Sequence, residues 1–159
     1  MTAPRILLEG VSVIRGGQRI LDAVNLDLNA RRIAVIGENG SGKSTFARLL
    51  NGLVAPSSGR VLVHGHDPER DGTALRRRVG FVFTDPQAQI LMPTPAEDLA
   101  LSLRGMPRGD VARRVATVLA EHGLSAQADI PATELSGGQK QMLALASVLI
   151  TEPALLVAD

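Results

Sequence analysis

Short apolar runs separated by polar turns fill the first third of the chain, a pattern that predicts β-strands. Apolar residues recur through residues 5–14 and 18–28, and Gly16 and Gly17 form a turn between them. Residues 32–37, with the sequence RIAVIG, form a continuous apolar run that ends in glycine, as expected of a strand buried on both faces. We therefore expect a hairpin followed by a buried strand.

The pattern then changes to helical spacing at several places. Residues 43–53 are predicted as a helix, with Gly52 as its stop signal. From Thr94 to about Leu124 the chain is predicted to be helical, because Thr94, Pro95 and Glu97 match a capping box. Residues 137–150 are apolar on most faces, which predicts a buried helix. Further strands are predicted over residues 60–65, 79–83 and 154–159. This alternation indicates an α/β sheet with a helical insertion.

Composition narrows the class of protein. A chain of 159 residues can bury one core, and a net charge of +1 argues against a general attraction to nucleic acid or membrane. The absence of cysteine excludes disulfides and thiol-bound metal and fits a cytosolic protein. The N-terminus carries no targeting pattern, and the longest apolar stretch, residues 142–150, is about half a membrane span. We expect a protein that is soluble alone and needs a partner for any membrane role.

One glycine-rich segment carries a recognisable chemistry. Residues 37–44, with the sequence GENGSGKS, fit the phosphate-loop pattern between a predicted strand and a predicted helix. Glycines let backbone N–H groups turn toward phosphate oxygens, and the helix N-terminus adds a positive dipole end. Lys43 would contact the β- and γ-phosphates, and the Ser44 hydroxyl would ligate Mg²⁺.

A second marker is the pentapeptide LSGGQ at residues 135–139. Ser136 and two glycines precede a predicted helix, which makes a second potential anion site. The plain alternative is an N-cap after a loop, and the pairing with the phosphate loop argues against it.

The segments GENGSGKST, LSGGQKQ and ALLVAD, in this order, resemble the nucleotide-binding domain of ABC transporters over essentially the whole chain. The resemblance implies a P-loop α/β fold with an antiparallel β part and a helical subdomain. It also implies that two such domains close head to tail, with ATP and Mg²⁺ between the phosphate loop of one and the LSGGQ of the other. We expect a nucleotide-binding core over residues 1–93, a helical subdomain over 94–136, and the signature helix and Walker B strand over 137–159.

The resemblance assigns roles residue by residue. Asp159 matches the Walker B aspartate and, with Ser44, would hold Mg²⁺; Lys43, Asp159 and Thr84 are the catalytic candidates. The expected nucleotide-binding residues are Arg15, Gly37, Glu38, Asn39, Gly40, Ser41, Gly42, Lys43, Ser44 and Thr45. The residues expected to contact the ATP of the opposite subunit are Leu135, Ser136, Gly137, Gly138 and Gln139.

Two positions depart from the family pattern. Arg15 stands where the family has an aromatic residue that stacks on adenine; an arginine can stack on a purine, or it can be a solvated turn residue. Thr84 stands where the Q-loop glutamine is expected, and its shorter side chain cannot span the same gap. Gln87 and Gln89 follow Pro86 and are expected to face elsewhere.

The segment FVFTDPQAQILMPTPAEDLALSL resembles the Q-loop region of energy-coupling-factor ATPases, and the biotin-uptake member looks closest, with cobalt or nickel uptake next. This implies a peripheral ATPase on the cytoplasmic face of the membrane, partnered by a second ATPase subunit, a membrane coupling protein and a substrate-binding membrane component. Residues 89–98 would receive the coupling protein, with Asp98 the cleaner probe of that surface, and no nucleic acid partner is expected.

Other readings remain open at this stage. The family pattern continues beyond Asp159 with a catalytic glutamate and a switch histidine, so we expect an N-terminal part of a longer ATPase, or an inert remnant of one. A soluble ABC ATPase of the DNA-repair or translation type is a further alternative, although residues 42–135 leave no room for the insertions of that group. The three histidines are expected to be structural, His64 and His66 in a surface turn and His122 near a helix end.

Overall fold

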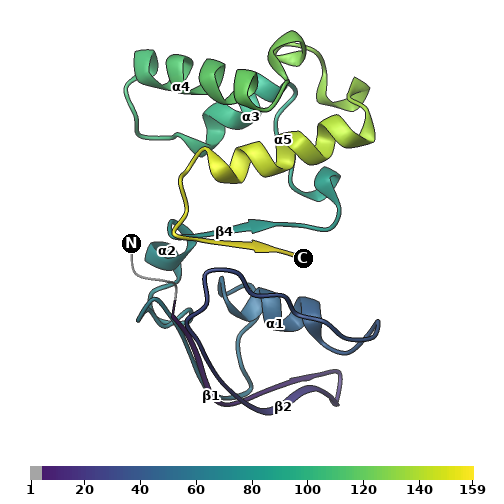
Figure 1. Cartoon of the computed structure of the whole chain (residues 1–159), viewed down its shortest axis with the longest axis vertical. Coiled ribbons are helices and arrows are strands. Elements are labelled where there is room, and N and C mark those ends of the chain that lie inside the picture. Colours follow the sequence, from purple (N-terminus) through teal and green to yellow (C-terminus); the bar gives the residue numbers. More distant parts are fainter. Residues whose placement is uncertain (1–4) are drawn as a thin grey trace. The chain divides into compact units, whose positions relative to one another are not determined.

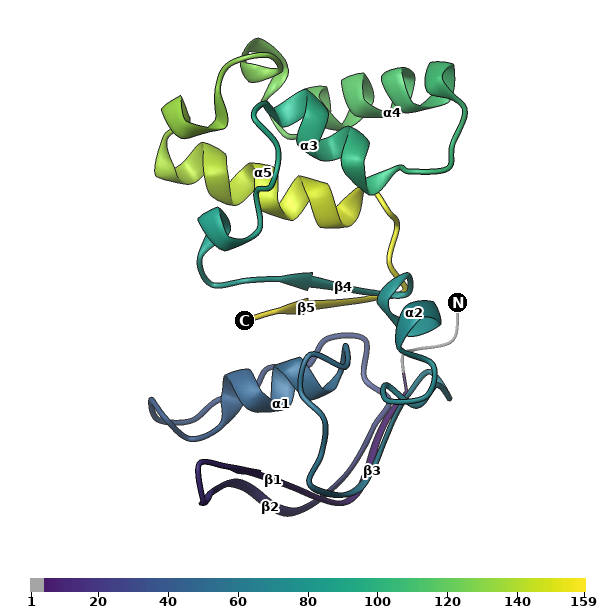
Figure 2. The same cartoon turned by 180° about the vertical axis from the view of Figure 1, so that it is seen from behind.

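The computed structural model describes residues 5–159, which divide into two compact units (Figures 1 and 2). Of the described residues, the first unit comprises residues 5–80, Ala154–Val157 and Asp159, and the second comprises Phe81–Pro153 and Ala158. Strands dominate the first unit and helices the second, so the fold mixes the two classes as the sequence predicts.

A three-stranded antiparallel sheet forms the base of the first unit. Its strands are β1 (Ile6–Arg15), β2 (Gln18–Leu28) and β3 (Ser58–Val63), in the order β2-β1-β3. The hairpin turn falls at Gly16 and Gly17 as predicted, and both residues have positive φ. One face of β1 is buried through Ile6, Leu8, Val11 and Val13. The strand predicted over residues 5–14 is confirmed, and the buried positions change from even to odd numbers across the register shift between Leu8 and Val11.

Two short helices belong to the first unit, and two short strands have residues in both units. They are α1 (Lys43–Leu49), α2 (Gly72–Arg76), β4 (Val79–Val82) and β5 (Leu155–Ala158). Helix α1 buries Phe46 and Leu49, and it is followed by Gly52 at φ +74°, whose N–H bonds the Leu49 carbonyl. Strands β4 and β5 pair with their arrows in the same direction (Figure 1), and the N–H of Leu155 donates to the carbonyl of Arg78.

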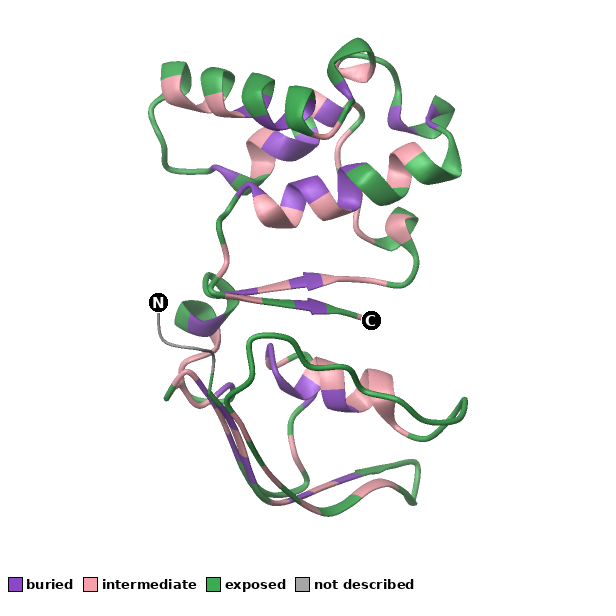
Figure 3. Ribbon diagram, viewed as in Figure 1, coloured by how far each residue is buried: buried purple, intermediate pink, exposed green. Residues whose placement is uncertain are grey.

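Three helices and three 3₁₀ turns make up the second unit. The helices are α3 (Pro95–Ser102), α4 (Arg108–Glu121) and α5 (Gly137–Leu149), and the turns are η1 (Pro86–Ala88), η2 (Ser125–Gln127) and η3 (Ala132–Glu134). Figure 3 shows buried stretches on all three helices. The residues of this core are Leu99, Leu103, Val115, Val118, Leu119, Leu124, Ala132, Leu135, Leu143, Ala146 and Ile150.

The caps of two helices follow the sequence signals. The Thr94 hydroxyl accepts from the N–H of Glu97 and donates to the Glu97 carboxylate. In a complete capping box that carboxylate would instead accept from the backbone N–H of Thr94. At α5 both halves of a capping box are present, since Ser136 accepts from the N–H of Gln139 and the Gln139 side chain accepts from the N–H of Ser136.

The strand predicted over residues 32–37 is wrong. These residues form no strand, and Ile36 is 93% exposed. A strand buried on both faces needs a paired neighbour on each side, and among residues 5–159 no strand pairs with this segment. The buried strand expected at the end of the chain is also only partly right, because in β5 Val157 is buried while Leu156 is 42% exposed.

Helix α5 is less buried than predicted, since Met142 is 38% exposed on one side while Leu143, Ala144 and Ala146 are buried. Within residues 5–159, no helix has both the length and the apolar character needed to cross a bilayer.

Candidate functional site

The phosphate loop has the backbone geometry that its glycines permit. Gly40 and Gly42 have φ of +83° and +91°, values that disfavour any residue with a Cβ atom. The N–H of Phe46 donates to the Gly42 carbonyl at 2.8 Å, the first backbone bond of helix α1. The N–H groups before Phe46 in this turn therefore have no intrahelical acceptor, which is the arrangement that binds phosphate oxygens.

Lys43 closes this loop. Its Nζ donates to the carbonyl oxygens of Gly37 at 2.8 Å and Glu38 at 2.7 Å. An ammonium group has three N–H donors, so one donor remains for a ligand held within the loop. The side chain is therefore held by the residues that begin the motif and lies beside the loop that would surround a phosphate.

Close packing fixes where the loop lies. A Cβ atom at Gly42 would come 3.0 Å from the Ile20 carbonyl oxygen and 3.0 Å from a methyl of Leu21. A Cβ at Gly37 would come 2.7 Å from the Ser41 hydroxyl. The loop is thus seated against strand β2, and side chains at these positions would displace it.

The residues after the loop carry the expected metal-binding groups. Ser44 and Thr45 are half-buried in the first turn of α1, directly after Lys43. Asp159 follows β5, and its carboxylate accepts from Nη2 of Arg48 at 3.3 Å, with 9% of the Asp159 side chain exposed. Arg48 lies four residues after Ser44 and so on the same face of α1. Hydroxyl and carboxylate oxygens are donors that suit Mg²⁺, so this set of residues fits the ion beside a triphosphate.

Arg15 is the exposed last residue of β1, paired opposite Gln18. The same hairpin brings Ile20 and Leu21 against Gly42, so Arg15 lies at the end of the hairpin that contacts the phosphate loop.

The signature residues begin helix α5 in the second unit. Leu135 is 5% exposed and anchors the segment in the helical core, whereas Ser136, Gly137 and Gly138 are exposed. The capping box uses the Ser136 hydroxyl and the Gln139 side chain, which leaves the N–H groups of the two glycines at the first turn. The motif therefore presents an exposed helix N-terminus without side chains in front of it.

Thr84 lies in an exposed bend after β4. The nearby Gln89 faces away from that bend, since its amide nitrogen donates to the Ala144 carbonyl at 2.7 Å. The expectation that Gln89 faces elsewhere is therefore confirmed, although its partner in α5 was not foreseen.

Asp98 was expected at the surface, and that expectation is wrong. It is 3% exposed, and its Oδ1 accepts from the N–H groups of Leu91 at 2.8 Å and Met92 at 3.1 Å. A buried carboxylate needs such donors, so Asp98 holds the loop from inside. Its place in the first turn of a helix, next to the buried Leu99, is the sequence signal that was missed.

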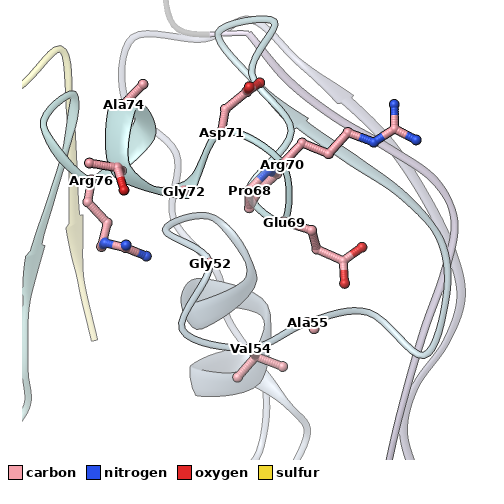
Figure 4. A pocket seen from close by; sticks show the side chains of 11 residues that line it. Gly52, Val54, Ala55, Pro68, Glu69, Arg70, Asp71, Gly72, Ala74 and Arg76 are labelled. Carbon is pink, nitrogen blue, oxygen red and sulfur yellow. The ribbon is translucent and has the colours of Figure 1, made fainter.

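A cavity of about 690 Å³ lies in the first unit apart from these motifs (Figure 4). It is bordered by Gly52, Val54 and Ala55 on one side and by the loop leading into α2 on the other. Its charged residues are of both signs, Glu69 and Asp71 with Arg70 and Arg76. None of the residues predicted for the nucleotide site lines it.

Comparison with known proteins places the chain in a family. It belongs to the ABC transporter family, because the sequence model of that family matches residues 21–159. The match covers the phosphate loop, the signature and Asp159, so the family assignment and the predicted fold class are confirmed.

Within this family, the chain is similar to ATP-binding proteins named for biotin transport and for energy-coupling factor transporters. The chain is 46% identical to the biotin transport ATP-binding protein BioM of Rhizobium etli over 97% of this chain and 69% of the relative. It is 41% identical to the energy-coupling factor transporter ATP-binding protein EcfA1 of Symbiobacterium thermophilum over 100% of this chain and 60% of that protein.

A solved structure, cbiO1 of Clostridium perfringens, described as part of the ABC transporter complex cbiONQ, superposes with a TM-score of 0.83 at 32% identity, covering 97% of this chain and 64% of that one. The chain thus spans about two thirds of the length of the proteins it matches.

Proposed function

We propose that the chain is the nucleotide-binding part of an energy-coupling-factor ATPase subunit that binds and hydrolyses Mg-ATP to drive uptake of a small nutrient. The observation that carries this proposal is the phosphate loop closed by Lys43, with Asp159 held against the helix that bears Ser44. Supporting it are the order of the motifs and the names of the relatives, all of them ATP-binding subunits of transport systems.

In this proposal each loop residue has a distinct task. Backbone N–H groups from Gly37 to Thr45 surround the phosphates, and Lys43 neutralises charge on the outer two. Ser44 and Asp159 supply oxygen donors to Mg²⁺, which would offset phosphate charge when bound. Arg15 stacks on the base, and Thr84 contacts the reacting end more weakly than a glutamine would.

A second ATPase subunit completes each site. The exposed N-terminus of α5, with Ser136, Gly137 and Gly138 in front, has the donor groups and the dipole to bind a phosphate presented by another chain. Among the described hydrogen bonds, no acceptor is paired with the N–H groups of Gly137 and Gly138, so these groups can bind a ligand held by another chain.

The membrane partner would bind along residues 87–93. Leu91 there is 72% exposed, and a cavity of about 600 Å³ is lined by Gln87, Ile90, Leu91, Met92, Pro93, Ala132, Thr133 and Lys140. Ile90, Leu91 and Met92 are consecutive apolar residues that line this cavity, and a contiguous apolar surface favours a protein partner. The proposed location is therefore the cytoplasmic face of the membrane, bound to a coupling protein and its substrate-binding component.

Biotin is the proposed substrate, because the relative named BioM matches nearly the whole chain at 46% identity. Cobalt or nickel is the alternative. The test is uptake of labelled biotin in cells lacking the gene of this subunit, complemented with the wild-type gene or with Lys43→Ala. Loss of biotin uptake that only the wild type restores is expected. Normal biotin uptake with lost nickel or cobalt uptake would assign the metal instead, and no uptake defect of any kind would contradict the proposed function.

A further inference from the structure

Gln89 ties the loop after β4 to the helix that begins with the signature. Its side-chain oxygen accepts from the N–H of Phe83 at 3.1 Å. Its side-chain nitrogen donates to the Ala144 carbonyl at 2.7 Å and lies 3.3 Å from the Ser147 hydroxyl. Ser147 itself is buried and donates to the same Ala144 carbonyl at 3.0 Å. One partly buried side chain therefore bridges two segments that are about 60 residues apart.

The chemistry of the partners fixes how this amide is oriented. A backbone N–H can only donate and a backbone carbonyl can only accept, so the oxygen must face Phe83 and the nitrogen must face Ala144. Glutamine offers an acceptor and a donor at this reach. Glutamate would keep the first contact and lose the second, and methionine would lose both.

A second anchor holds the other end of the same loop. Asp98, at the start of α3, accepts from the N–H groups of Leu91 and Met92. Leu91 is held by Asp98 through its backbone N–H, while its side chain is 72% exposed and available to a partner. The loop is thus fixed to α5 through Gln89 and to α3 through Asp98, and it cannot shift without disturbing one of them.

We propose that Gln89 is a positioning residue that transmits movement of residues 83–92 to the signature residues of helix α5. Ala144 lies seven residues after Gly137, two turns along a continuous helix, so a shift at Ala144 moves the helix N-terminus with it. This inference deepens the proposed function and rests on it for the role of the signature. It accounts for a glutamine that is engaged in α5 instead of facing a nucleotide.

Hydrogen exchange of the wild-type chain and of Gln89 variants tests whether Gln89 links the loop to α5. In Gln89→Met the amide of Phe83 should exchange about tenfold faster, since it loses the acceptor that protects it. In Gln89→Glu it should stay protected while the α5 contact is lost, which provides a milder variant if the first folds poorly. Gln127→Met and Gln127→Glu are matched controls, because Gln127 lies in the same unit and its side chain makes no hydrogen bond among the described residues. Equal exchange at Phe83 in wild type and Gln89→Met would overturn the link.

Transmission is tested in the assembled transporter by measuring ATP affinity, ATP turnover and uptake together. Both Gln89 variants should keep the wild-type ATP affinity but move severalfold less substrate per ATP hydrolysed, while both Gln127 variants keep the wild-type ratio. An unchanged ratio in Gln89→Met, despite faster exchange at Phe83, would overturn the positioning role. A wild-type protein that neither binds ATP nor supports uptake would instead refute the proposed function, while the exchange result still decides whether the link exists.

Discussion

At the scale of single residues, Lys43 has the most direct test. Its Nζ is held by two loop carbonyls, so its charge is fixed beside the loop before any ligand arrives. Lys43→Ala should weaken Mg-ATP binding by about 1.5–3 kcal/mol, the usual worth of a hydrogen bond to a charged group. Isothermal titration calorimetry measures this. Lys140→Ala, the only other lysine, removes the same charge outside the phosphate loop and should leave ATP affinity unchanged. Equal affinity in wild type and Lys43→Ala would contradict the assignment.

A second prediction at the residue scale concerns the contribution of Asp98 to stability. Asp98→Ala removes the acceptor for two N–H groups in a buried setting. The free energy of unfolding should fall by about 1.5–3 kcal/mol, because those donors lose a charged partner. Denaturant unfolding measures the change. Glu97→Ala removes a neighbouring carboxylate that is exposed, so it should cost clearly less; an equal loss in the two variants would show that burial of Asp98 does not matter.

At the scale of elements, the phosphate loop separates two effects of glycine. Gly40 and Gly42 both have positive φ, but a Cβ at Gly40 would meet nothing within 4 Å, whereas at Gly42 it would meet strand β2 at 3.0 Å. Gly42→Ala should therefore reduce ATP affinity more than Gly40→Ala, which carries only backbone strain of about 1–2 kcal/mol. Titration of both variants with Mg-ATP gives the order. The reverse order would show that contact with β2 does not position the loop.

Local signals predicted the elements that local interactions determine. The Gly16-Gly17 turn, the Thr94 cap and the Ser136 cap were readable because each depends on residues within a few positions. Residues 32–37 were read as a strand because an apolar run alone cannot show whether neighbouring strands exist to pair with it. The partners of Gln89 and the burial of Asp98 were not predicted for a similar reason, since they depend on tertiary contacts that no spacing in the sequence reveals.

At the scale of the whole molecule, His64 links stability to pH. Burial, together with the nearby Arg78 and His66, lowers the pKa of His64, and its buried Nε2 has no hydrogen-bond partner among the described residues. The folded state thus favours neutral His64, and the unfolded chain binds the proton more readily. The free energy of unfolding is therefore unaffected by His64 above pH 6.5, and it decreases as the pH falls below that value.

His64→Asn should reduce that acid sensitivity. Asparagine tolerates the positive φ of +52° at this position and does not titrate. The melting temperature of the variant should fall less than that of the wild type between pH 7 and pH 5. Melting curves across this range are the measurement, and parallel losses in the two proteins would contradict a role for His64.

The exposed apolar segment gives the last prediction, which concerns association of whole chains. Ile33, Val35 and Ile36 are 39%, 49% and 93% exposed, side by side in a segment that pairs with no strand of the described chain. A segment with unpaired backbone groups and apolar, uncharged side chains is a site for pairing with another chain. The 159-residue protein should therefore self-associate as its concentration rises.

Ile36→Lys should suppress this self-association, because a charge at the most exposed position opposes strand pairing. Light scattering or size-exclusion chromatography over a concentration series measures it. Leu91→Lys, at another highly exposed apolar residue, is the control and should associate like the wild type. A wild type that stays monomeric at every concentration, or equal suppression by both substitutions, would show that this segment does not drive association.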